Sequence, residues 1–600
     1  MSKSPCDERN THPTKGNFVT EARSFRRLVA LLFATALFAA ACGGGDSSDG
    51  AAESSGGSDD VAEADADQPE AETSGADASA DGSDVVSAED EAVEVVGGGT
   101  LRVGLQTEAG SLNPTNTGLN RGPIMVATAI FDTLVVVDED GNWHNNMTES
   151  WTPNDDFSSW EVRIRPGIEF SDGLPFDAPA VVGTIETFLA DPLTSLVFRP
   201  AFDAENPVEL IDDMTLRINA NGPNGQLPVY FSEQLGMVGS PAWLDAAEAN
   251  PELDQTPIGA GPFVLADRSQ DASTVLVRNE NWWREDADVL LDEIEFVPVV
   301  QPGTRADQLL VGDFDLVHGN ATLFILPLRD EGEGIQRIED NSGEEFLLSM
   351  NAQVPPFDDI RVRQAATNLF PRAAYDEFIL QGASLPANSL FSPESPFHDP
   401  GLEQAVDMPE LVDPLISAYC AETPASCTDG RVNIEYQYDI SLSNDQIFDV
   451  VSDAMSDHFN IEVQSIPNDV HIQEVIFGQY NMATWRYHGF ADPDVDTAFL
   501  SCSTIGALSI NWARNCNDER DALFDQQRVT QDFDERYGIW QDIQANLRDS
   551  FQYVVAHHTN WSVGAGLNVG GICDSVTPDG VALPCQTRGV PRLDQVFLTN

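Results

Sequence analysis

Lysine is nearly absent from this chain. The 600-residue sequence has two lysines, Lys3 and Lys15, both near the amino terminus. The chain after Lys15 therefore cannot contain a Schiff-base lysine or the lysine of a phosphate-binding loop. The sequence also has no His-Glu-x-x-His and no Gly-x-Ser-x-Gly motif, which argues against an exported hydrolase. A scattered catalytic triad or carboxylate pair would leave no local pattern, so that alternative stays open.

Positive charge is scarce throughout. The chain has 30 Lys and Arg against 99 Asp and Glu, a formal net charge of −69. Six of the basic and three of the acidic residues precede residue 42, which leaves 24 arginines against 96 acidic residues. Nucleic acids and anionic membrane surfaces repel such a protein. We therefore expect no nucleic-acid partner.

The sequence has one marked apolar run, at residues 28–38, and it is shorter than the ~20 residues that span a bilayer. Arginines precede it, and three alanines followed by Cys42 and a glycine triplet end it. This order is typical of a secretion signal. It resembles a bacterial lipoprotein signal peptide, residues 1–41, with Cys42 as the acylated first residue. An ordinary signal peptide cut nearby is the alternative, and Arg26-Arg27 also permits twin-arginine export.

Residues 42–99 have the composition of a tether. Residues 43–99 carry 17 acidic residues and no lysine, arginine or aromatic residue. Such a segment cannot bury enough apolar surface to offset the entropy of ordering, so we expect it to be disordered and extended. The protein would then be exported and held by its lipid on the outer face of the cytoplasmic membrane or cell envelope.

The cysteines suit an exported protein. Apart from Cys6 and Cys42, six cysteines form three close pairs, separated by 7, 14 and 12 positions. Six cysteines allow 15 connectivities, and local pairing is the simplest. No CxxC spacing or nearby histidine favours a metal site, so we expect neither metal nor cofactor. The predicted disulfides are Cys420–Cys427, Cys502–Cys516 and Cys573–Cys585.

The remaining chain mixes strand and helix patterns. Residues 101–105 and 160–165 have strand character, the latter with alternating apolar and polar residues. Asp177 is placed to cap a helix whose apolar stripe runs through residues 181–189. Residues 447–459 predict another helix, directly followed by a strand at residues 461–463. Strands and helices mixed in this way predict α/β lobes.

Several ordered blocks carry a resemblance to a known family. They are residues 147–151, 162–178, 257–263, 278–283, 312–315 and 356–365. Together they resemble the family 5 extracellular solute-binding proteins, the peptide, dipeptide and nickel-binding components of ABC importers. The resemblance implies an α/β, periplasmic-binding-protein-like fold of class II (cluster C type). In that fold two lobes are joined by crossing strands and accompanied by an extra domain.

The resemblance also implies boundaries and partners. We expect lobe I at about residues 100–140, 256–340 and 555–600, the extra domain at about 141–255, and lobe II at about 341–554. Within the solute-binding domain, residues 100–600, the lobes would close around a peptide, opine, sugar or chelate. A monomer without enzymatic activity would deliver it to ABC permease subunits with a separate ATPase. A sensor or surface protein on the same fold is the alternative.

The predicted ligand contacts lie between residues 480 and 512. Peptide-binding members carry an aspartate four residues before a proline in this segment, and here Gly489 stands four residues before Pro493. We therefore expect weak recognition of a peptide amino terminus. Arg486 is placed to pair with an anionic group, and the aromatic residues would cover apolar surface, unless the tryptophans only brace the local hairpin. The predicted contacts are Trp485, Arg486, Tyr487, His488, Asp492 and Trp512.

Overall fold

The computed structural model describes residues 97–599 except 109, 119, 285, 286 and 288. The predicted signal peptide, Cys42 and nearly all of the predicted tether lie outside these residues. The described residues belong to one compact unit, residues 90–600. None of the helices in this part of the chain combines the length and the apolar character needed to cross a bilayer.

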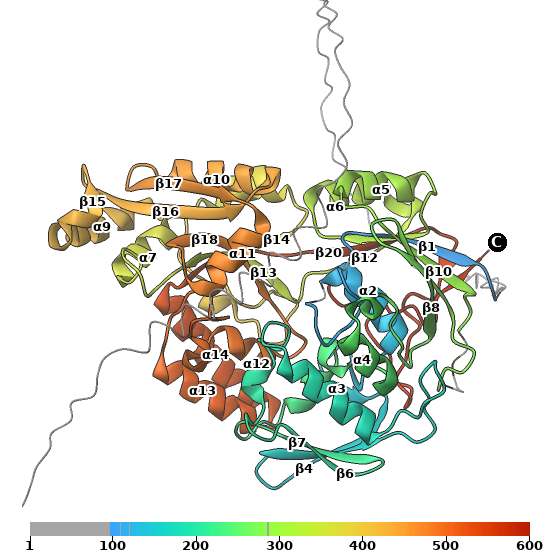
Figure 1. Cartoon of the computed structure of the whole chain (residues 1–600). Helices are drawn as coiled ribbons and strands as arrows, with labels where there is room; N and C mark the ends of the chain where they lie inside the picture. The colour runs from blue at the N-terminus through green and yellow to red at the C-terminus, as the bar shows by residue number, and fades with distance from the viewer. Residues whose placement is uncertain (1–96, 109, 119, 285–286, 288, 600) are drawn as a thin grey trace, which may run out of the picture. The chain divides into compact units, whose positions relative to one another are not determined.

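A mixed seven-stranded sheet contains the first described strand (Figure 1). The predicted strand at residues 101–105 is confirmed as β1, which pairs in parallel with β10 and β11, while the other pairs are antiparallel. The spatial order is β12 (Gln336–Asp340), β20 (Trp561–Ala565), β11 (Leu316–Gly319), β1 (Thr100–Leu105), β10 (Glu293–Pro298), β9 (Ser273–Arg278) and β8 (Phe263–Ser269).

Helices cover both faces of this sheet. Leu101, Val103 and Leu105 alternate along β1 and enter a core with α2 (Arg121–Phe131) and α4 (Pro241–Ala249). On the opposite face, α5 (Pro302–Leu310) and α6 (Thr322–Asp330) pack together over β11. Figure 1 shows these two helices side by side.

A four-stranded antiparallel sheet and one helix form a separate core. The sheet has the order β4 (Thr148–Pro153), β5 (Ser159–Ile164), β7 (Thr215–Asn219) and β6 (Val208–Asp212). Buried and exposed side chains alternate along β5 as its sequence predicts. The predicted helix is also confirmed, because Asp177 accepts a hydrogen bond from the backbone nitrogen of Ala180, 3.0 Å away, at the start of α3 (Ala178–Ala190).

The second large sheet is the centre of the C-terminal half. Leu347 and Leu348 are neighbours on β13 and enter different cores, because successive side chains of a strand point to opposite faces. The order is β14 (Leu385–Pro386), β19 (Tyr553–His558), β13 (Glu344–Met350), β18 (Met482–His488), β16 (Arg431–Asp439) and β15 (Cys427–Thr428), with β17 (Phe459–Ile466) also paired to β16.

The two cores of this sheet are completed by helices. One contains residues of α7 (Ile360–Asn368), α8 (Arg372–Tyr375), α9 (Val412–Glu422) and α10 (Leu442–Met455). The other contains residues of α11 (Asn468–Phe477), α13 (Asp518–Val529) and α14 (Phe533–Ser550). The predicted helix at residues 447–459 was wrong at its end. Phe459 is buried in the same core as Met455, so the apolar spacing continues, but it already belongs to β17.

The chain crosses between the two large sheets at two places. It leaves β12 and enters β13 through residues 341–343, and it returns from β19 to β20 through residues 559–560. The backbone nitrogen of Thr559 donates a hydrogen bond to the carbonyl oxygen of Glu344, 2.6 Å away. The second crossing segment therefore contacts the chain at the residue directly after the first.

Smaller features agree with the sequence analysis. The structure contains the disulfides Cys420–Cys427, Cys502–Cys516 and Cys573–Cys585. Two small antiparallel sheets complete the strands, the hairpin of β2 (Val135–Val137) with β3 (Trp143–Asn145) and the pair of β21 (Val569–Gly570) with β22 (Phe597–Leu598).

Candidate functional site

A cavity of about 500 Å³ lies beside the crossing segments. Its wall includes residues from β12 and β13, and therefore from both large sheets. Parts of α2, of the β2–β3 hairpin, and of segments 232–237, 390–397 and 583–592 also line it. The end of β18 and the segment after it contribute Tyr487, residues 489–491, Pro493 and Asp496. The volume falls within the range of small-molecule sites, ~300–1,000 Å³.

The aromatic residues predicted as ligand contacts have different surroundings. Tyr487 lines the cavity, and its hydroxyl donates a hydrogen bond to the carbonyl oxygen of Asp496, 3.0 Å away. The rings of Trp485 and Trp512 contact each other with their centroids 5.2 Å apart, and Trp485 also packs on His471. The cavity wall, as far as the structure describes it, includes neither tryptophan. The side chain of His488 lies outside the described part.

The two charged candidates also lie outside the described wall of the cavity. Arg486 is exposed on β18, at the register position opposite Phe346. Asp492 is buried and caps α12 (Pro493–Asp496) by accepting a hydrogen bond from the backbone nitrogen of Asp494, 2.8 Å away. It also forms an ion pair with Arg536 at 2.5 Å. Ligand contact by these residues stays a prediction.

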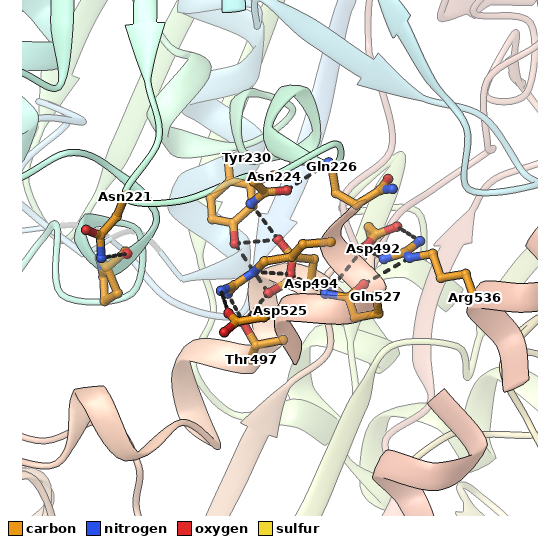
Figure 2. Close-up of polar contacts among 12 residues, drawn as sticks. Asn221, Asn224, Gln226, Tyr230, Asp492, Asp494, Thr497, Asp525, Gln527 and Arg536 are labelled. Atoms are coloured by element: carbon orange, nitrogen blue, oxygen red, sulfur yellow. Dashed lines mark hydrogen bonds and ion pairs between the residues drawn. The ribbon is translucent and has the colours of Figure 1, made fainter. Parts of the chain in front are cut away.

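Asp494 is the centre of a buried polar cluster that holds α12 in place. Figure 2 shows side chains from three segments converging on its carboxylate. Oδ2 accepts hydrogen bonds from Asn224 (2.8 Å) and Tyr230 (3.0 Å). Oδ1 accepts them from Gln527 (2.5 Å) and from Arg528 of α13 (2.8 Å). The four-stranded-sheet region, α12 and α13 are thus joined through one carboxylate.

The charge of Asp494 is matched within this cluster. The side chain is 0% exposed, and burial alone would raise its pKa. Arg528, Arg536 and the hydrogen bonds outweigh burial and hold the pKa of Asp494 below its usual range. Because Pro493 and Asp496 at the two ends of α12 line the cavity, the cluster fixes part of the cavity wall.

Two buried carboxyl groups line the cavity, and their pKa values shift in the opposite direction to that of Asp494. Glu345 on β13 and Asp496 at the end of α12 are each 3% exposed. Burial raises the pKa of Glu345 well above its usual range, and the nearby Asp496 and Glu344 add to this. Burial also raises the pKa of Asp496, although a hydrogen bond from the backbone nitrogen of Phe490 opposes the effect.

Three arginines line the same cavity, and each lies near a carboxylate. Arg588 forms an ion pair with Glu233, and the Arg121 guanidinium lies 3.8 Å from the same carboxylate. Arg592 lies 3.1 Å from Asp132 and 3.4 Å from Asp594. Burial lowers the pKa of Arg121 to about 10, and the neighbouring Arg486 contributes to this.

Gly489 lies where the cavity wall touches a crossing segment. A methyl group built on Gly489 would overlap the carbonyl oxygen of Gly343, between β12 and β13. The carbonyl oxygen of Gly489 also accepts a hydrogen bond from Arg588. The backbone of Gly343 therefore occupies the space that a side chain at position 489 would need.

Sequence reasoning did not find Glu345, Asp496, Arg121 or Arg588. A signal was present for the first two, because Glu344-Glu345 opens a mostly apolar strand and Asp492, Asp494 and Asp496 recur at every second position. The arginines have no local signal. Arg588 and Glu233, for example, are brought together only by the tertiary fold.

Comparisons with known proteins agree on one family. The family described as "Bacterial extracellular solute-binding proteins, family 5 Middle" matches residues 142–504. The nickel-binding periplasmic protein of Escherichia coli (strain K12) is 24% identical over 490 residues, or 77% of this chain and 90% of that protein. The glutathione-binding protein GsiB of the same organism is 27% identical over 272 residues, 45% of this chain and only 51% of GsiB.

Solved structures show the same fold. The periplasmic binding protein DppA from Helicobacter pylori, in complex with the peptide STSA, gives a TM-score of 0.71 at 18% identity, covering 84% of this chain and 99% of that one. AgaA from A. tumefaciens R10, in complex with agropinic acid, gives a TM-score of 0.70 at 18% identity with the same coverage. The predicted α/β fold with two lobes is confirmed.

Proposed function

Because the chain belongs to the bacterial extracellular solute-binding proteins of family 5, we propose that it captures a small solute between its two lobes and delivers it to an ABC permease with a separate ATPase. The observation that carries this proposal is the cavity, whose wall combines β12 of one large sheet with β13 of the other. Contacts that form only when both sides meet favour the closed state, so solute binding and closure are coupled. No bond needs to form or break.

Binding is tested by thermal unfolding of the full-length protein with dipeptides, glutathione, opines, sugars and nickel chelates. We expect at least one solute to raise the unfolding temperature, because a ligand at 100 times its dissociation constant stabilises a protein by about 2.7 kcal/mol. Uptake of that solute should stop when either this gene or the gene of its permease is deleted. Binding without any effect on uptake would indicate a sensor, and binding of no solute would contradict the proposal.

We further infer that the protein is held at the membrane by a lipid on Cys42, which directly follows the segment that resembles a lipoprotein signal peptide. Cys42→Ala should move the protein from washed membranes to the soluble fraction, because the acylated residue carries the attachment. Fractionation and immunoblotting measure the change. Cys6→Ala is the matched control, since Cys6 lies inside the predicted signal peptide, and it should stay in the membrane fraction. Retention of the Cys42→Ala protein would show that another segment anchors it.

A further inference from the structure

Arg588 has a backbone conformation that arginine rarely adopts. It forms the tip of a tight turn with Gly589, and the backbones of Thr587 and Val590 exchange two hydrogen bonds of 3.0 and 3.1 Å across this turn. The φ angles of Arg588 and Gly589 are 50° and 80°, as a type I′ turn requires at both central positions. Asn, Asp and Gly favour such a position, whereas a left-handed φ is unfavourable for a long side chain. Strain of this kind in a cavity wall indicates that the side chain itself has a function there.

The side chain of Arg588 joins parts of the molecule that are distant in sequence. It is 2% exposed and forms an ion pair with Glu233, which lies in the segment that completes the core of the four-stranded sheet. Its guanidinium donates a hydrogen bond to the carbonyl oxygen of Gly489, directly after β18, and lies 5.2 Å from the ring centroid of Phe490. The backbone nitrogen of Arg588 donates to Oδ2 of Asp340 at the end of β12, 2.7 Å away. All five residues line the cavity.

A guanidinium suits this place because of its shape. Its planar fork carries five N–H donors, enough to serve the Glu233 carboxylate and the Gly489 carbonyl oxygen at the same time. A buried charge is strongly unfavourable when its partner is taken away. If either wall segment moved away, the guanidinium would lose its ion pair or its hydrogen bond. The contacts of Arg588 therefore favour the described arrangement of the wall over arrangements in which these segments separate.

We propose that Arg588 is a positioning residue of the solute cavity. It holds Glu233, the Gly489–Phe490 backbone and the end of β12 in the arrangement that binds the solute. This role explains why a strained turn carries an arginine. The proposal rests on the proposed function and deepens it, because it names the residue that fixes the cavity wall. Arg588 acts through the wall segments and requires no contact with the solute.

Hydrogen–deuterium exchange of the full-length protein without solute tests the proposal. Arg588→Asn removes the guanidinium, and asparagine tolerates a left-handed φ. The backbone amides of residues 233–237 and 489–496 should exchange about tenfold or more faster in this variant, because both segments lose the partner that they share. Exchange that changes only within residues 583–592, or nowhere, overturns the proposal.

Arg514 offers a matched control. Its φ is also 50°, the residue is 8% exposed, and its guanidinium donates to two backbone carbonyl oxygens, each 2.8 Å away. It does not belong to the described wall of the cavity. Arg514→Asn should leave the exchange of residues 233–237 and 489–496 as it is in the wild type. If it accelerates these segments as much as Arg588→Asn does, general loosening explains the effect and the proposal is wrong.

Isothermal titration separates positioning from direct contact with the solute. The probes are Ala-Ala, glutathione, maltose and the nickel–EDTA chelate. Each probe that binds the wild type should bind Arg588→Asn about tenfold or more weakly whatever its charge, because the whole wall shifts. Arg588→Lys keeps the charge without the fork and should be intermediate in both experiments, which also covers a failure of Arg588→Asn to fold.

The remaining outcomes also decide. A loss confined to the anionic probes, with exchange as in the wild type, overturns the positioning role in favour of direct contact. Undiminished binding of every probe by both variants overturns it as well. If no probe binds the wild type, the exchange experiment alone decides whether Arg588 positions the wall, and the thermal screen decides the proposed function.

Discussion

Replacing Asp494 by asparagine should lower the free energy of unfolding by about 3 kcal/mol. Removing one partner of a buried ion pair typically costs ~3–5 kcal/mol, because the other charge remains buried without compensation. We expect the lower end of this range, since the side chain of Arg528 keeps 25% of its surface exposed to water. The asparagine amide also presents donors where Gln527 or Tyr230 now donates, so part of the hydrogen bonding is lost as well.

The same arginine provides a matched control for this prediction. Asp525 lies 3.8 Å from the Arg528 guanidinium, but its side chain is 83% exposed, and exposed ion pairs contribute little to stability. Figure 2 shows Asp494 and Asp525 within the same group of polar contacts. Urea unfolding curves of the two asparagine variants measure the difference. Equal midpoints for Asp494→Asn and Asp525→Asn would show that the buried cluster does not stabilise the protein.

A side chain at position 489 should sharply weaken solute binding. Gly489→Ala would place a methyl group onto the carbonyl oxygen of Gly343. Relieving an overlap with backbone requires the cavity wall or the crossing segment to move, and overpacking of this kind typically costs ~1–3 kcal/mol. If the cost falls on the closed form, the dissociation constant rises about 5- to 150-fold. Gly489→Asp, which restores the family's aspartate, should be at least as damaging.

Titration of the solute found in the thermal screen measures this effect. Gly538→Ala is the control, because its added Cβ would meet no atom within 4 Å apart from its chain neighbours and the backbone of its own helix, α14. That variant should bind as the wild type does. Undiminished binding by Gly489→Ala, or tighter peptide binding by Gly489→Asp, would mean that the two glycines separate when the solute is bound.

Local signals in the sequence predicted much of the fold. The alternation at residues 160–165, the capping position of Asp177 and the three close cysteine pairs each depend on residues near in sequence, and the structure contains all of them. The end of α10 was missed because Phe459 enters the same core from a strand as the helix residues do. The spacing of apolar residues shows which side chains are buried together, but it does not show whether the backbone is a helix or a strand.

The cavity was less predictable for a physical reason. The contact of Asn224 with Asp494 joins residues 270 positions apart, and those of Glu233 with Arg588 and Gly343 with Gly489 also form only in the folded chain. The resemblance indicated that Gly489 replaces an aspartate, but it could not show that Gly343 fills the space. The resemblance placed the predicted ligand contacts at residues 480–512. In this segment Tyr487 lines the cavity, whereas Trp485 and Trp512 contact each other.

The two crossing segments have a mechanical consequence. The segments 341–343 and 559–560 are short, and the hydrogen bond from Thr559 to Glu344 joins the second segment to the end of the first, where β13 begins. Short straps joined side by side resist sliding and stretching, while both can bend about a shared axis. If the lobes close as we propose, we expect the two large sheets to move mainly by rotation about this axis. A single distance measured across the cavity would then describe the whole path from open to closed.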